Sequence, residues 1–228
     1  LGQSMPVTSK LALITTEKDG VLKHRLILDC RVSGSNDAAY RSERILLPKA
    51  WDIVNGIMEL RKRVVDDEVV ELMVLDFADA FYMLPLRGDE RSFFTAHYKG
   101  EFYVWLRIAQ GSINGPTAFG RLSALTARMT QGLYHPGRLQ LQIYTDDPCA
   151  VLRGRPMDIR RMVTVLALFW MAIGWGLSFH KAQLGKMVSW VGFTFTITKT
   201  DVLVSIKEYF MRDFKQLVGD LMQARRVS

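Results

Sequence analysis

The chain has 228 residues, and its content of 49% hydrophobic and 23% charged residues excludes a disordered or fibrous protein. The length is sufficient for one large domain or two small ones with a sizeable core. A formal net charge of +7 favours a polyanionic partner such as a nucleic acid, although charge alone does not establish one.

The two cysteines, Cys30 and Cys149, are too few for a disulfide framework or a cysteine-rich zinc site. We interpret them as buried, reduced thiols. The first ten residues lack a signal-peptide pattern and an initiator methionine. We therefore expect a fragment of a longer protein that resides in the reducing cytoplasm or nucleus and is not secreted.

The first half of the chain alternates strand-like and helix-like patterns. Five apolar runs have the length and composition of strands: 11–16, 25–30, 69–77, 92–98 and 101–108. Asp19-Gly20 predicts a turn between the first two runs, and Lys99-Gly100 predicts a hairpin between the last two. One helical pattern begins at Pro48 and continues to about residue 64, because apolar residues recur there at helical spacing.

The second half of the chain predicts three further helices, at 115–129, 157–175 and 206–223. Two strand pairs, at 139–153 and 189–205, lie between them. Strands joined mostly by hairpins and interleaved with helices favour an α+β fold over a parallel doubly wound sheet.

One segment has the length of a short membrane span. Residues 162–179 hold 18 positions without a charge, which is the lower limit for a bilayer-spanning helix. Glycine, serine and threonine dilute this segment, and Arg160, Arg161 and Lys181 bracket it. We therefore predict a buried helix of a globular core and no membrane partner.

Four aspartates stand at the ends of predicted strands. Asp76 and Asp79 occur in "LDFADAF", and Asp146 and Asp147 stand at the turn of the predicted strand pair 139–153. If the strand ending at Asp76 lies beside that hairpin, the buried carboxylates require a cation. A hard divalent ion such as Mg²⁺ fits carboxylate oxygens, and two such ions assist phosphoryl transfer. Taken singly, each pair also fits a solvated turn or a helix cap.

The order of these motifs resembles that of reverse transcriptases of the retroviral and long-terminal-repeat retrotransposon type. The likeness extends from about residue 18 to 197. Three motifs are similar to those of the family's palm: Asp76, Asp79, Ala80 and Phe81; Gln110, Gly111, Gly115 and Pro116; and Tyr144, Thr145, Asp146 and Asp147. Two more lie outside the palm core, in the segments 23–36 and 176–195.

The resemblance implies an RNA-directed DNA polymerase domain of a retroelement, which adds dNTPs to a primer 3′-hydroxyl on an RNA or DNA template. It implies the fingers and palm of a right-hand polymerase, with an antiparallel palm sheet backed by helices, in a longer polyprotein. The expected fingers are residues 1–40 and 84–114, the expected palm is residues 41–83 and 115–197, and residues 198–228 would begin a truncated thumb.

For catalysis, the resemblance implies two Mg²⁺ ions, or Mn²⁺ in their place. Asp76 and Asp146 would be the main metal ligands, with an outer contribution from Asp147. Lys181 is the candidate proton donor to the leaving pyrophosphate, and it fits an ordinary surface lysine equally well.

The same resemblance implies binding roles. The expected nucleotide-binding residues are Lys18, Arg25, Asp79, Ala80, Phe81, Gln110 and Gly111. The ring of Phe81 would exclude a ribose 2′-hydroxyl, and the alternative is a core aromatic residue. The expected primer–template residues are Tyr144, Thr145, Trp190, Val191 and Gly192.

The sequence departs from the family pattern at two positions. Pro148 follows the acidic pair where relatives usually have a branched apolar residue, and Gly115 stands where serine is frequent. Two alternatives stay open. One is a catalytically inactive or domesticated nucleic-acid-binding remnant, and the other is a group II intron or retron type of reverse transcriptase, in which alanine is usual at the position of Thr145.

Overall fold

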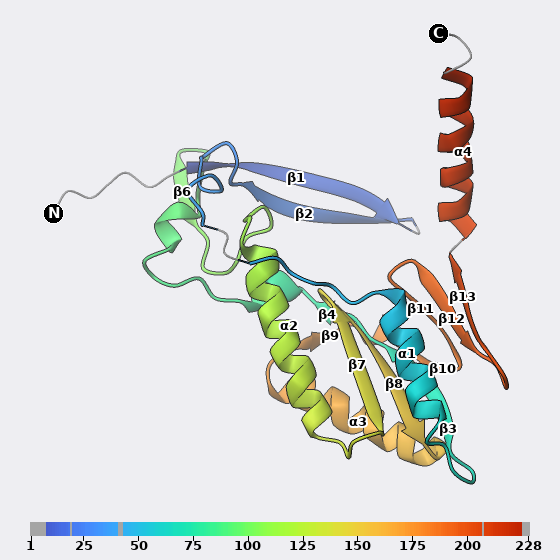
Figure 1. The fold of residues 1–228 in the computed structure, drawn as a ribbon. Coiled ribbons are helices and arrows are strands. Elements are labelled where there is room, and N and C mark those ends of the chain that lie inside the picture. Colours follow the sequence, from blue (N-terminus) through green and yellow to red (C-terminus); the bar gives the residue numbers. More distant parts are fainter. Residues whose placement is uncertain (1–7, 19, 41–42, 207, 225–228) are drawn as a thin grey trace. The chain divides into compact units, whose positions relative to one another are not determined.

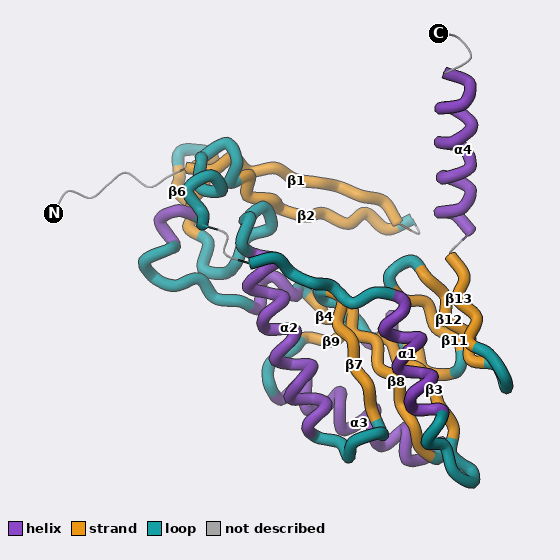
Figure 2. The backbone as a smooth tube through the Cα atoms, viewed as in Figure 1, coloured by secondary structure: helices purple, strands orange, loops and turns teal. Residues whose placement is uncertain are grey.

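The computed structural model describes residues 8–18, 20–40, 43–206 and 208–224. The chain divides into two compact units: the first comprises residues 1–46 and 79–125, and the second comprises residues 47–78 and 126–228. Helices alternate with strands along the chain (Figure 2). The described part contains four α-helices and mostly antiparallel sheets, which confirms the α+β class. The division into fingers, palm and thumb stays a prediction.

The first unit is built on a four-stranded sheet in the order β2-β1-β5-β6. Its strands are β1 (Thr8–Lys18), β2 (Val21–Asp29), β5 (Thr95–Tyr98) and β6 (Glu101–Val104). β1 and β5 are parallel, and the other neighbours are antiparallel. The predicted turn at Asp19-Gly20 lies between β1 and β2, with Asp19 outside the described residues. Four residues form the buried core of this unit: Leu28, Cys30, Ala96 and Ala109.

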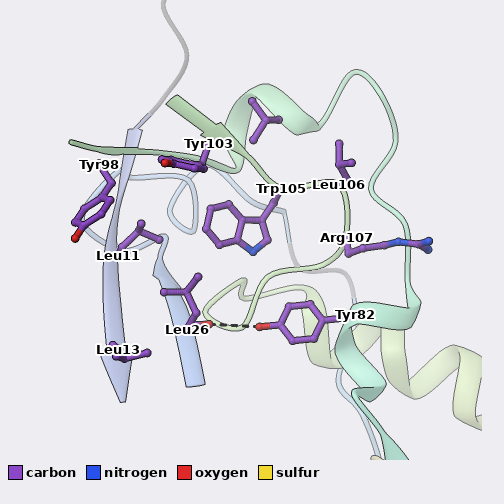
Figure 3. A pocket seen from close by; sticks show the side chains of 10 residues that line it. Leu11, Leu13, Leu26, Tyr82, Tyr98, Tyr103, Trp105, Leu106 and Arg107 are labelled. Atoms are coloured by element: carbon purple, nitrogen blue, oxygen red, sulfur yellow. Dashed lines mark hydrogen bonds between the residues drawn. The ribbon is translucent and has the colours of Figure 1, made fainter. Parts of the chain in front are cut away.

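A hollow of about 770 Å³ lies in the first unit (Figure 3). Its lining is mainly aliphatic and aromatic: Leu11, Leu13, Leu26, Tyr82, Tyr98, Tyr103, Val104, Trp105, Leu106 and Arg107. The Tyr82 hydroxyl lies 3.5 Å from the Leu26 carbonyl oxygen at one edge of this hollow. None of the site residues predicted from the sequence lines it.

The second unit contains an antiparallel sheet in the order β10-β3-β8-β7. Its strands are β3 (Val69–Val74), β7 (Leu139–Tyr144), β8 (Asp147–Gly154) and β10 (Gln183–Gly185). Helix α1 (Ala50–Arg61) covers one face of the sheet and helix α3 (Pro156–Ala172) covers the other (Figure 1). Alternate residues of β3 therefore face α1, where Leu72 packs in one buried cluster with Ile53 and Ile57.

Local chemistry explains where the helices of the predicted pattern begin and end. The Lys49 backbone amide donates to Asp52 Oδ2 at 2.6 Å, which caps the first turn of α1 one residue after Pro48. α3 ends at Ala172, before Gly174, whose φ of +96° terminates the helix earlier than the predicted residue 175. In the described ranges, no helix is both long enough and apolar enough to cross a bilayer.

In the described residues, the remaining strands form two smaller sheets, and two α-helices and three short helical turns, η1 (Ala80–Met83), η2 (Arg91–Phe93) and η3 (Phe179–Lys181), complete the elements. The predicted hairpin at 189–205 is a three-stranded meander of β11 (Met187–Trp190), β12 (Phe193–Ile197) and β13 (Val202–Ile206). β4 (Phe77–Ala78) pairs with β9 (Gly176–Leu177). The two helices are α2 (Gly115–Gly132), whose residues are shared between the units, and α4 (Glu208–Ala224).

The predicted strand 69–77 is interrupted at Asp76. The regular ladder between β3 and β8 ends at Val74 and Cys149. One residue further, the Leu75 amide donates to the Pro148 carbonyl at 3.3 Å. Pro148 has no amide proton to return, so the ladder cannot continue in its regular form, and Asp76 lies between β3 and β4.

Candidate active site

Asp76, in the link between β3 and β4, lies opposite Asp147, the first residue of β8, in the second unit. The Phe77 amide donates to the Asp146 carbonyl at 3.0 Å, and the hydrogen bond to the Pro148 carbonyl flanks Asp76 on its other side. In antiparallel strands, the residue between two such hydrogen bonds faces its cross-strand partner at the shorter of the two separations. The side chains of Asp76 and Asp147 therefore meet.

The two facing carboxyl groups have different proton affinities. Burial raises the pKa of Asp147 to about 6, and the nearby negative charges of Asp146 and Asp76 contribute to this rise. Burial also acts to raise the pKa of Asp76, but hydrogen bonds from Lys181 and Ser178 outweigh it and hold that pKa below its usual value. Asp76 is thus the more strongly ionised member of the pair.

Lys181 provides the positive charge that helps to lower the pKa of Asp76. Its ammonium nitrogen lies 2.6 Å from Asp76 Oδ2. The Asp76 side chain is 18% exposed and the Lys181 side chain is 49% exposed. Lys181 ends the short helical turn η3 (Phe179–Lys181), and Ser178, just before this turn, donates its amide to the Asp76 carbonyl at 2.9 Å. One segment therefore holds both the backbone and the carboxylate of Asp76.

The tight β7–β8 turn presents the two adjacent aspartates. Thr145 has a φ of +53°, a left-handed conformation that β-branched residues rarely adopt and that costs on the order of 1 kcal/mol. Its hydroxyl lies 2.8 Å from Asp146 Oδ1 and 2.7 Å from the Tyr144 carbonyl oxygen. The turn thus places the Asp146 carboxylate beside Thr145, while Asp147 faces the neighbouring strand.

Trp190 supports this turn from the interior of the second unit. Its indole N–H donates to the Asp147 carbonyl at 2.8 Å, and its ring contacts Tyr144 edge-on at 6.3 Å between centroids. Trp190 is 3% exposed, so it is a core residue as well as a neighbour of the acidic turn. Val191 and Gly192, with φ values of +45° and +82°, form the turn between β11 and β12. The primer–template roles of these residues stay predictions.

The chemistry of the donor set fits a hard divalent cation. Mg²⁺ binds in proteins through one or two carboxylates, with water and substrate phosphates completing its coordination. Asp76 and Asp147 provide two such groups, and the Lys181 ammonium stands in for a cation beside Asp76. Over the residues described here, no group of three aspartate, glutamate, histidine or cysteine side chains is arranged to hold an ion. A third protein ligand from Asp146 would therefore require its carboxylate to reorient.

Four of the predicted nucleotide-binding residues lie in the first unit, and all but Arg25 stand at the ends of elements. Arg25 is an exposed residue of β2. Lys18 ends β1, and its side chain lies outside the described residues. Asp79 has a φ of +50° and precedes the helical turn η1 (Ala80–Met83), in which Ala80 is 4% exposed.

Phe81 is stacked on a second aromatic ring in the first unit. Its ring centroid lies 5.3 Å from that of Phe119, and the two planes differ by 19°. A Cβ atom at Gly115 would lie 3.4 Å from the Phe81 ring and 3.1 Å from Ile108. A side chain at Gly115, one of the two departures from the family pattern, would therefore be in ordinary contact with the Phe81 ring and would press on Ile108.

The backbone at Gln110 and Gly111 is fixed against β2. The Gln110 carbonyl accepts a hydrogen bond from the Leu28 amide at 3.0 Å. Gly111 has a φ of +115°, and a Cβ atom there would lie 2.0 Å from the Leu28 carbonyl oxygen, so only glycine fits. The Asn36 amide group also donates to the Gly111 carbonyl at 3.0 Å. These contacts order the loop in which both predicted residues lie.

Three contacts of the candidate site were not predicted from the sequence. They are the hydrogen bonds of Ser178 to Asp76, of Thr145 to Asp146, and of Trp190 to Asp147. Each contact joins a polar group to an acidic residue that the sequence had singled out. Thr145 and Trp190 lie in motifs that the sequence analysis had named, although their contacts were not predicted. No sequence pattern distinguishes Ser178 from an ordinary loop serine.

No protein-family model and no curated protein matches the sequence. Solved structures of foamy virus protease–reverse transcriptase share the fold. In a complex of that protein with double-stranded DNA, 94% of this chain aligns with 40% of the viral chain, at 18% identity and a TM-score of 0.68. In a second double-stranded DNA complex, 94% of this chain aligns with 33% of the viral chain, at 19% identity and a TM-score of 0.67. In a complex with an RNA/DNA hybrid, 92% of this chain aligns with 25% of the viral chain, at 18% identity and a TM-score of 0.62.

The chain therefore has a reverse-transcriptase-like fold and spans between about a quarter and two fifths of the length of these viral proteins. Identities of 18–20% establish the fold alone. The polymerase activity, the metal ions and the nucleic acid partners are matters of proposal.

Proposed function

We propose that the chain is an RNA-directed DNA polymerase domain of a retroelement, which adds dNTPs to a primer on an RNA or DNA template. The observation that carries this proposal is the facing pair Asp76 and Asp147, beside Asp146, in a reverse-transcriptase-like fold. The formal charge of +7 is consistent with a nucleic acid partner. The solved viral proteins of this fold carry double-stranded DNA or an RNA/DNA hybrid.

In this proposal the acidic residues hold two Mg²⁺ ions, or Mn²⁺ in their place. Asp76 and Asp147 are already adjacent, and Asp146 joins them when its carboxylate turns from Thr145. The bound ions supply charge neutralisation and a lowered pKa of the primer 3′-hydroxyl. The Asp76 side chain is only 18% exposed, so little water competes with a metal ion for its carboxylate.

The other predicted residues bind and orient the substrates. Arg25, with Lys18, holds the triphosphate, and the backbone at Asp79 and Ala80 lies along its oxygens. Phe81 excludes a ribose 2′-hydroxyl, while Gln110 and Gly111 line the nucleotide. The residues assigned to the primer–template are Tyr144, Thr145, Trp190, Val191 and Gly192.

The proposed architecture is that of a right-hand polymerase. Fingers at 1–40 and 84–114, a palm at 41–83 and 115–197, and the start of a thumb at 198–228 form one part of a polyprotein. In the palm, the antiparallel sheet β10-β3-β8-β7 and the helices that cover it support the acidic residues. Lys181 is the proposed proton donor to the leaving pyrophosphate, and its ammonium is free for this role once it leaves Asp76.

Primer extension tests the proposed function. The purified chain should extend a DNA primer on an RNA template only when Mg²⁺ or Mn²⁺ is present. Asp76→Asn should reduce the rate by about a thousandfold or more, because it removes a charged ligand of the two-metal site. Asp201→Asn, which changes an exposed aspartate between β12 and β13, is the matched control and should retain the parent rate. Extension by Asp76→Asn at the parent rate would overturn the assignment.

A non-catalytic nucleic-acid-binding protein is the second candidate. Two observations favour it: no described group of three ligands is arranged for a metal, and Lys181 neutralises Asp76. Such a protein would bind a primer–template duplex, as measured by fluorescence anisotropy, and would extend no primer at any Mg²⁺ or Mn²⁺ concentration. If the parent extends the primer, and Asp76→Asn binds the primer–template duplex but does not extend it, the result supports the polymerase instead.

A further inference from the structure

We propose that Lys181 is a built-in counter-ion of the acidic site, which holds Asp76 in place while no divalent ion is bound and is displaced when one binds. The role rests on the metal binding proposed above and differs from proton donation, because it concerns the site before any substrate arrives. Lys181 acts in it as a positioning residue.

Backbone hydrogen bonds hold the segment that carries Lys181 next to Asp76. Ser178 bonds to the Asp76 carbonyl, and the Lys181 amide in turn donates to the Ser178 carbonyl at 3.0 Å. β9, just before this segment, pairs with β4, just after Asp76. The ammonium is therefore delivered to Asp76 by a short turn that is tied to Asp76 on the backbone as well.

The ion pair offsets a local excess of negative charge. Asp76, Asp146 and Asp147 adjoin one another, and the Lys181 ammonium contacts Asp76 Oδ2 of this group. Removing a cationic partner from a largely buried carboxylate leaves an uncompensated charge. Without Lys181, the three carboxylates would repel one another and the turn would be less stable.

The same contact places Lys181 in competition with a metal ion. Oδ2 accepts the ammonium at 2.6 Å, a separation that leaves no room for a cation between the two groups. A divalent ion that binds Oδ2 must displace the ammonium and then tolerate its positive charge nearby. Both effects weaken metal binding, so the loss of Lys181 should strengthen it.

Mn²⁺ binding to the whole chain, measured by the electron paramagnetic resonance signal of free Mn²⁺, tests this proposal without any polymerase reaction. Lys181→Met removes the charge and keeps the length of the side chain, and it should lower the dissociation constant about tenfold. Lys181→Arg keeps a cation and should bind as the parent does. Lys186→Met removes an exposed lysine five residues away and controls for the change in net charge.

The outcomes separate this role from the proposed function. Equal Mn²⁺ affinity of the parent and Lys181→Met would overturn the counter-ion role and leave the metal site standing. The absence of Mn²⁺ binding to all four proteins would overturn both. A lower melting temperature of Lys181→Met in the presence of a chelator, with no gain in Mn²⁺ affinity, would reduce Lys181 to a structural contact and would also overturn the role.

A measurement on the unmodified chain covers the case in which Lys181→Met does not fold. Acetylation of lysines by a water-soluble anhydride, followed by mass spectrometry, reports how free each ammonium is. Mg²⁺ should raise the labelling rate of Lys181 about threefold or more, because the ion pair is broken, and leave that of Lys186 unchanged. Unchanged labelling of Lys181 at a Mg²⁺ concentration that saturates the site would overturn the proposal.

Discussion

Trp190 and Asp147 are joined by a hydrogen bond of 2.8 Å from the indole N–H to the backbone carbonyl, across 43 residues of sequence. The bond reaches the first residue of β8, directly after the acidic turn. It fixes the backbone that carries Asp147, so Trp190 influences the candidate site without contacting a carboxylate. The meander β11–β13 thereby supports the turn of the β7–β8 hairpin.

Trp190→Phe should destabilise the chain by about 1–3 kcal/mol, because it removes this hydrogen bond and leaves a small cavity. Urea unfolding followed by circular dichroism measures the loss. Trp51→Phe is the matched control, since Trp51 is 66% exposed on α1. It should change the free energy of unfolding by less than about 0.5 kcal/mol. Equal effects of the two substitutions would contradict the role of Trp190.

The stability of the chain should respond to pH through Asp147. Its pKa in the folded chain is about 6, above the ordinary value of 3.8, so the folded state binds this proton more tightly than the unfolded state does. Asp147 therefore destabilises the fold progressively as pH rises from about 4 through 6, and the full penalty remains above that range.

Asp147→Asn removes this penalty. Without divalent ions at about pH 7.5, it should be more stable than the parent by about 1 kcal/mol, a figure reduced for the partial exposure of the group. The difference should shrink at about pH 4.5, where the folded parent is largely protonated at this site. Urea unfolding at the two pH values checks the trend, and a difference that is independent of pH would contradict it.

Gly111→Ala should prevent the loop at Gln110 from packing on β2. Its Cβ atom would overlap the Leu28 carbonyl oxygen, and the φ of +115° is itself unfavourable for alanine, so we expect a loss of about 3 kcal/mol or more. Gly34→Ala, at a φ of +73° with open space around the new atom, should cost only about 1 kcal/mol. Thermal unfolding of both variants tests the comparison.

Phe81→Val tests the proposed selection of the sugar. The smaller side chain should admit ribonucleotides and reduce discrimination by about 2–4 kcal/mol, the scale of a relieved packing clash. Incorporation of matched deoxy- and ribonucleotides by parent and variant gives the ratio. Phe102→Val, at an aromatic residue that is 61% exposed in the same unit, should leave that ratio unchanged. An unchanged ratio in Phe81→Val would mean that the ring only packs on Phe119.

Much of the secondary structure follows from local patterns. Helical spacing after Pro48 and the Gly115-Pro116 start were enough to predict α1 and α2, since these signals depend on residues close in sequence. The ends of strands and helices were predicted less accurately than their presence. Pro148 ended the β3–β8 ladder from across the sheet, and Gly174 ended α3 three residues before the predicted position.

The sequence by itself determined which residue types are candidates: adjacent acids at a hairpin turn and a third acid at a strand end. It did not determine their pairing. Only the register of β3 against β8 places Asp76 opposite Asp147, and only the fold brings Lys181, 105 residues away, to within 2.6 Å of Asp76. Strand register and long-range ion pairs depend on packing over the whole unit, and a shift of one residue would turn each side chain to the other face of the sheet.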